Sequence, residues 1–173
     1  MLVLAASTSW AADAPAAKTL KVLSLGSASL TMVWSPRWEL EPNAPGLPAD
    51  SVAFRTEDKL AMLAYLSKGP MREGESGDEG IRLTTSVVAQ RYRSQAVEEN
   101  IELQRMAGER VHGYYFCITD RAPKPDEYKY MCQGMASVDG TLVVFNVLYN
   151  DAGKDEAHEV VTAIKSLQLS VKT

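Results

Sequence analysis

The sequence predicts an α+β protein, a largely antiparallel β-sheet covered by two helices. Residues 141–149 are rich in β-branched and aromatic residues and apolar on both alternating faces, which indicates an interior strand. After a turn signal at residues 150–153, apolar residues follow at helical spacing: Ala157, Val160, Val161 and Ile164. Most of the other strand-like segments follow one another through turns, which is typical of antiparallel pairing.

The first half of the chain contains four strand-like segments. These are residues 19–25, 28–34, 51–56 and 59–67. Pro36 ends the second, because proline cannot donate to a sheet ladder. Residues 41–50 hold three prolines and a glycine and predict a surface loop. Residues 68–80 hold four glycines and many charged residues, which predicts a solvated linker.

The second half contains a helix, further strands and the C-terminal helix. Residues 81–95 have an apolar face typical of a helix that packs on a sheet. Residues 97–106 alternate loosely and predict a strand with an exposed polar side, and residues 167–171 predict a short closing strand. The total is roughly eight strands and two helices in one domain, residues 18–173.

The N-terminal segment, residues 1–17, indicates an exported protein. A brief apolar run is followed by small residues with Ala-x-Ala spacing, as at the end of a secretory signal peptide. A basic region before the apolar run is missing, so we expect the true start to lie upstream. The other interpretation is a disordered alanine-rich tail. We expect a periplasmic or secreted protein.

Composition restricts the classes of partner. The apolar fraction is 46% and the net charge is −4, values typical of a soluble globular protein. An acidic chain gives no basic face for nucleic acid. No stretch approaches the roughly 20 apolar residues of a membrane span.

Cys117 and Cys132 lie on two strand-like segments, residues 112–119 and 127–134, joined by a proline-containing loop. If these segments pair as a hairpin centred on the loop, the two cysteines lie opposite each other, close to bridging geometry. In an exported protein this predicts a disulfide. In a cytosolic protein the same residues would be reduced core cysteines.

Three tyrosines form a candidate binding patch beside this pair. Tyr115 shares one side of its strand with Cys117, and Tyr128 and Tyr130 share one side of the next with Cys132. The cluster has two interpretations: cross-strand packing that shields the disulfide, or an amphipathic contact surface.

Motifs for catalysis are missing from the sequence. It contains no Gly-x-Ser-x-Gly elbow, dinucleotide fingerprint or phosphate loop, so we expect no catalytic residues and no cofactor. Asp155, His158 and Glu159 share a polar helix face, where a solvated charged surface is the ordinary interpretation, and we assign no metal. His112 begins a strand and has no ligand beside it in the sequence.

The order of elements resembles the PsbP-like family, which includes photosystem accessory proteins, a nuclear Ran-binding protein and DcrB-like bacterial envelope proteins. The resemblance covers residues 19–173 and depends on the Pro36-Arg37-Trp38 corner and the helix end Ile164-Lys165-Ser166-Leu167. It implies an α/β/α sandwich and a non-enzymatic role, because members of that fold mostly bind or stabilise partners.

Two functional hypotheses follow. The first is an exported, soluble, non-catalytic accessory protein that binds a protein partner in the cell envelope. The second is a small-molecule or metal-binding protein, or a hydrolase, built around His112 or the face of Asp155, His158 and Glu159.

Overall fold

The computed structural model describes residues 18–25, 28–48, 51–69 and 77–171. Within these ranges the chain forms ten strands, two α-helices and one short 3-10 helix. The signal-like segment 1–17 and residues 70–76 of the predicted linker lie outside the described residues.

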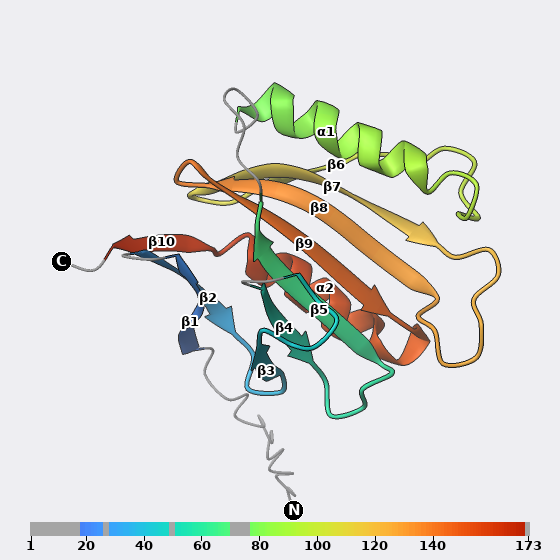
Figure 1. Ribbon diagram of the computed structural model, residues 1–173, viewed down its shortest axis with the longest axis horizontal. Helices are drawn as coiled ribbons and strands as arrows, with labels where there is room; N and C mark the ends of the chain where they lie inside the picture. Colours follow the sequence, from blue (N-terminus) through green and yellow to red (C-terminus); the bar gives the residue numbers. More distant parts are fainter. Residues whose placement is uncertain (1–17, 26–27, 49–50, 70–76, 172–173) are drawn as a thin grey trace, which may run out of the picture.

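The elements alternate between runs of strands and single helices (Figure 1). The strands are β1 (Lys18–Leu25), β2 (Ala28–Trp34), β3 (Glu39–Pro42), β4 (Ser51–Arg55), β5 (Met62–Lys68), β6 (Gln104–Ala107), β7 (Val111–Thr119), β8 (Tyr130–Val138), β9 (Thr141–Tyr149) and β10 (Gln168–Val171). The helices are α1 (Asp78–Arg91), η1 (Asp151–Gly153) and α2 (Lys154–Ile164). This is the α+β class that the sequence predicts.

The larger sheet has seven strands in the order β3-β4-β5-β9-β8-β7-β6, and all its neighbours are antiparallel. Strand β9 lies at the centre, as its apolar residues on both faces predict. Strands β8 and β9 are joined by Asp139 and Gly140, both with positive φ. A two-residue hairpin turn with this backbone matches the right-handed twist of the strands.

The two helices cover opposite faces of this sheet (Figure 1). Helix α1 buries Ile81, Thr85 and Ala89 and packs on β7 and β8. Helix α2 packs on β5 and β9, and it buries all four apolar residues of its predicted stripe. The predicted arrangement, a sheet covered by two helices, is therefore confirmed.

Three strands form a second, smaller sheet in the order β1-β2-β10. It shares the α2 side of the larger sheet, because Leu30 and Met32 of β2 join the same hydrophobic core as Val160 and Ile164 of α2. The sequence pattern does not separate these three strands from the larger sheet. Periodicity shows which residues of a strand are buried but does not show which strand is its neighbour.

Several predicted boundaries are also corrected. Residues 97–103 are not a strand, and β6 begins only at Gln104. Strand β8 begins at Tyr130 rather than at residue 127. Strand β3 extends into the predicted loop of residues 41–50, and its last residue, Pro42, is tolerated because β3 is an edge strand. Helix α1 begins at Asp78, with acidic residues in its first turn as the helix dipole favours.

Candidate binding surface

The two cysteines and two of the three tyrosines predicted beside them, Tyr115 and Tyr130, lie on the α2 side of β7 and β8. Alternate residues of a strand point to the same face of the sheet. This places five side chains on the α2 side, which we name the tyrosine–disulfide face: Tyr115, Cys117, Tyr130, Cys132 and Tyr149. Helix α2 packs on β9 and β5, and the three tyrosines stay half-buried.

Cys117 and Cys132 form the predicted disulfide. The two residues face each other across the β7–β8 ladder, with a Cα–Cα distance of 4.1 Å and an S–S distance of 2.06 Å. The predicted hairpin register is therefore confirmed. Both cysteines belong to the main core cluster, Cys132 as a buried member and Cys117 at its margin.

Tyr130 and Tyr149 form the aromatic part of the face. They are paired across β8 and β9, and their rings stack with centroids 5.1 Å apart and an interplanar angle of 24°. The Tyr149 hydroxyl lies 4.0 Å from Sγ of Cys132. Burial, with smaller contributions from Tyr130 and Glu98, raises the pKa of Tyr149, so this hydroxyl keeps its proton at neutral pH. The stack thus lies directly beside the disulfide.

Tyr115 lies at the other end of the face. Its hydroxyl donates a hydrogen bond of 2.6 Å to Oε1 of Gln104 on β6, and its ring contacts Phe145 with centroids 6.3 Å apart. Tyr115 is opposite Gly134 in the ladder. The hydrogen bond and the ring contact together hold the Tyr115 side chain in one position.

Asp151 and Lys129 form a charged rim next to Tyr130. The Tyr130 hydroxyl donates to Oδ1 of Asp151 at 2.7 Å, and Nζ of Lys129 lies 3.4 Å from Oδ2. The same Nζ lies 4.9 Å from the centroid of the Tyr130 ring, within cation–π range. The hydrogen bond from Tyr130 and the nearby ammonium lower the pKa of Asp151. The rim is therefore charged at neutral pH and fixes the Tyr130 ring.

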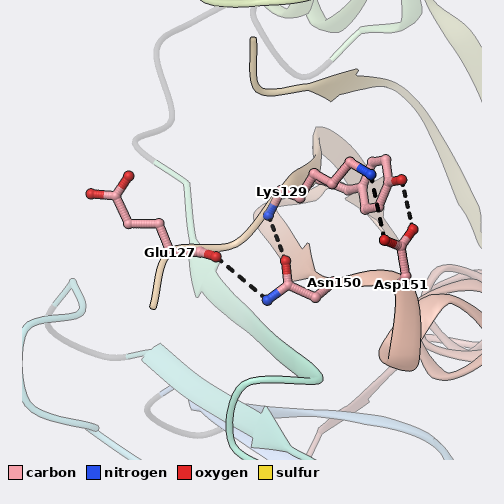
Figure 2. Close-up of polar contacts among 5 residues, drawn as sticks. Glu127, Lys129, Asn150 and Asp151 are labelled. Atoms are coloured by element: carbon pink, nitrogen blue, oxygen red, sulfur yellow. Dashed lines mark hydrogen bonds and ion pairs between the residues drawn. The ribbon is translucent and has the colours of Figure 1, made fainter. Parts of the chain in front are cut away.

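Asn150 ties three segments together beside this rim, and Figure 2 shows its bonds to two residues of the loop before β8, Glu127 and Lys129. Its Oδ1 accepts a hydrogen bond of 2.8 Å from the backbone N–H of Lys129. Its Nδ2 donates to the carbonyl oxygens of Leu60, at 3.0 Å, and Glu127, at 3.4 Å. One side chain thus joins the end of β9 to the β4–β5 connection and to the loop before β8.

Replacing Asn150 with alanine should lower the free energy of unfolding by about 2 kcal/mol, because two good hydrogen bonds are lost and the half-buried backbone N–H of Lys129 is left without its acceptor. The Asn150→Asp variant keeps the acceptor for Lys129 but loses the donor, so its loss should be intermediate. The measurement is urea denaturation, with Asn100→Ala, an exposed asparagine, as the matched control. Equal losses in the Asn150→Ala and Asn100→Ala variants would contradict this role.

Glu98 lies at the β7 edge near Tyr149, in the segment predicted as a strand. Its carboxylate accepts hydrogen bonds from the backbone N–H of Thr119, at 2.9 and 3.1 Å, and from the Thr119 hydroxyl at 2.8 Å. Burial alone would raise the pKa of Glu98, but these hydrogen bonds outweigh it, and the pKa lies below its ordinary value. A side chain therefore takes the place of a strand partner at this edge.

Tyr128 does not join the other two predicted tyrosines. It precedes β8, donates a hydrogen bond of 2.7 Å to the carbonyl oxygen of Lys59, and packs in a separate cluster with Ala53, Leu63 and Leu148. Those residues are on the α1 side of the sheet, opposite to Cys132. The prediction that Tyr128 shares a side with Cys132 was wrong, because the strand alternation begins only at Tyr130.

The two alternatives of the second hypothesis, His112 and the polar face of α2, lie on different elements. His112 is at the start of β7, on the α1 side, while His158 and Asp155 are exposed on α2. Glu159 forms an ion pair with Arg37. Among the described residues, no group of three or more His, Cys, Asp or Glu side chains is placed to hold a metal ion.

Two members of the surface were missed by the sequence reasoning. The sequence places Tyr149 only within an interior strand, although its position opposite Tyr130 follows once the β8–β9 register is known. The sequence pattern places Glu98 in a strand with an exposed polar side and does not show its bonds to Thr119. The Asp139-Gly140 pair, a strong hairpin signal, would have given the register that places Tyr149.

Comparisons with known proteins concern the fold. No protein-family model matches the chain, and no curated protein matches it. None of the described helices has the length and hydrophobicity that crossing a bilayer requires.

Two solved structures are similar to this chain. One is the solution structure of cyanobacterial PsbP (CyanoP) from Synechocystis sp. PCC 6803, with 13% identity and a TM-score of 0.48, over 82% of this chain and 86% of that one. The other is a crystal structure from Bacteroides thetaiotaomicron VPI-5482, with 14% identity and a TM-score of 0.46. That match covers 82% of this chain but only 45% of the other. The first similarity is to a PsbP protein, the family that the sequence resembles.

Proposed function

We propose that the protein is an exported, non-catalytic accessory protein that binds a protein partner in the cell envelope through the tyrosine–disulfide face. The observation that carries the proposal is the placement of Tyr115, Tyr130 and Tyr149, half-buried and held in position around the disulfide. Tyrosines of this kind supply large contact area at a low cost in side-chain entropy.

The composition of the face supports a protein as the partner. Protein interfaces combine an aromatic centre with a polar rim, and tyrosine is enriched among the residues that contribute most to binding. Here the stacked pair of Tyr130 and Tyr149 forms the centre, the charged rim of Lys129 and Asp151 lies next to Tyr130, and Glu98 lies near Tyr149. These groups are satisfied within the protein, so a partner would meet a rigid surface.

Export is supported by two independent features. Residues 1–17 resemble the end of a signal peptide. The disulfide is the second feature, because such bonds persist in oxidising compartments and are rare in the cytosol.

The test is site-specific photocrosslinking in the native envelope. A benzophenone amino acid replaces Tyr130 in one variant and Val87, which is 56% exposed on α1, in the control. We expect a crosslinked protein from position 130 and not from position 87. The captured protein, once purified, should bind the wild type about tenfold more tightly than the Tyr149→Ala variant. Equal capture at both positions, or equal binding by both proteins, would refute the proposal.

A further inference from the structure

The two sulfurs of the disulfide have different surroundings. Cys132 is on an inner strand, is 5% exposed, and faces Val147 of β9, which is fully buried. Cys117 is half-buried on β7, near the margin of the sheet. The neighbouring edge strand β6 begins only at Gln104, opposite Tyr115, so its ladder does not extend to Cys117.

This difference in burial determines from which side a thiolate can attack the Cys117–Cys132 disulfide. Thiol–disulfide exchange needs a thiolate that approaches one sulfur in line with the S–S bond, and its rate depends on access to that sulfur. An in-line approach to Cys132 comes from the side of β9, where Val147 and the core beneath α2 close the path. The approach to Cys117 comes from the β7 edge beyond the end of β6, where none of the described strands pairs with this residue on the side away from β8. The chain before β6 returns to this edge at Thr119, which bonds to Val97 and to the Glu98 carboxylate, so the attacking thiolate enters between Tyr115 and Thr119.

We propose that Cys117 is a thiol-exchange site, at which an external thiolate, either a small thiol or a protein cysteine, forms a mixed disulfide. The incoming sulfur bonds to Sγ of Cys117. The electron pair of the broken S–S bond passes to Sγ of Cys132, which leaves as a thiolate and takes a proton from water. No net oxidation occurs, and a second thiolate would release Cys117 in the reduced form.

The surroundings of Cys132 suit a leaving sulfur. The Tyr149 hydroxyl, 4.0 Å from Sγ, keeps its proton and is placed to donate a hydrogen bond to the departing thiolate. Charge-assisted hydrogen bonds of this kind are stronger than neutral ones. The face that we propose for partner binding therefore also contains a bond that a partner's cysteine would reach from one side. The exchange chemistry itself does not depend on the proposed function.

The test uses the oxidised wild-type protein and reduced glutathione at about pH 8, where small thiols are partly ionised. Samples are quenched in acid, which stops exchange, and digested with pepsin for peptide mass spectrometry. We expect glutathione on Cys117 to exceed glutathione on Cys132 about tenfold or more during the first turnover, because Cys117 is the more exposed of the two residues. The same reaction in urea, with the chain unfolded, should modify both sulfurs to similar extents.

Equal or reversed modification in the folded protein would overturn the proposal, as would the absence of any adduct when the unfolded control reacts.

A second readout is the exchange rate of the Tyr149→Phe variant, which should fall because the leaving thiolate loses its hydrogen-bond donor. The matched control is Tyr114→Phe, whose hydroxyl bonds to Asp78 on the opposite face. An unchanged rate in Tyr149→Phe would refute the role of that hydroxyl. The same experiment with a small protein that has one exposed cysteine, in place of glutathione, shows whether a protein thiolate also forms the mixed disulfide with Cys117.

Discussion

Replacing Phe145 with alanine is expected to lower the free energy of unfolding by about 3–5 kcal/mol, the range for large aromatic side chains in a close-packed core. Phe145 is fully buried at the centre of β9. Its ring fills the space above Gly134 of β8, where a Cβ would lie 2.5 Å from the Phe145 ring and 2.5 Å from Cβ of Tyr115. The glycine and the phenylalanine thus depend on each other, and removal of the ring would also uncover Tyr115.

Denaturant unfolding followed by circular dichroism measures this loss. The Phe145→Leu variant keeps much of the apolar volume and should lose far less stability than Phe145→Ala. The exposed control Val87→Ala should change the free energy of unfolding by less than about 0.5 kcal/mol. If Phe145→Ala cost no more than Val87→Ala, the packing of the α2-side core would have to be different from that described.

The parts of the fold that the sequence predicts are those with a local signal. The segment of β9 is rich in β-branched and aromatic residues and apolar on both faces, and helix α2 has a clear period of 3.6 residues; both elements lie where these patterns place them. The cysteine pairing follows from the position of the loop between two strand-like segments, because a hairpin centred there places residue 117 opposite residue 132. These features depend on contacts between neighbours in the sequence.

The parts that were not predicted depend on distant contacts. Strand β10 pairs with β2 in a separate sheet, and no local pattern distinguishes this partner from a strand of the larger sheet. Residues 97–103 alternate as a strand does, yet the Glu98 side chain takes the backbone N–H of Thr119 that a strand carbonyl would otherwise take. The competition between a side-chain acceptor and a ladder carbonyl is decided by the tertiary structure.

The candidate surface also combines residues placed by a local sequence pattern with residues placed by distant contacts. Tyr115, Tyr130 and the cysteines share a face because strand alternation places them there. Tyr128 departs from it because the chain before β8 turns to Lys59, a residue far away in the sequence. Asn150 was recognised only as a turn residue, although its side chain joins three segments. Turn propensity indicates where a chain reverses, but the additional bonds of such a side chain depend on what lies beside it.

Removing the disulfide is the second large effect that we expect. The double variant Cys117→Ala/Cys132→Ala should have a free energy of unfolding lower by about 3 kcal/mol, the value for a cross-link that closes a loop of about 15 residues. Much of this loss arises in the unfolded chain, which gains conformational freedom when the cross-link is absent. The backbone pairing of β7 and β8, from Val111 opposite Val138 to Thr119 opposite Tyr130, does not depend on the sulfurs.

The folded double variant should therefore keep the stacked Tyr130 and Tyr149 and the near-ultraviolet circular dichroism of the wild type, while unfolding at a lower denaturant concentration. Wild-type protein treated with excess dithiothreitol should unfold close to the double variant, and the reductant should have no effect on the variant itself. Equal unfolding midpoints for oxidised wild type and double variant would show that the cross-link contributes no stability. A loss of the aromatic signal in the folded variant would show that the disulfide, rather than the strand ladder and the charged rim, positions the tyrosines.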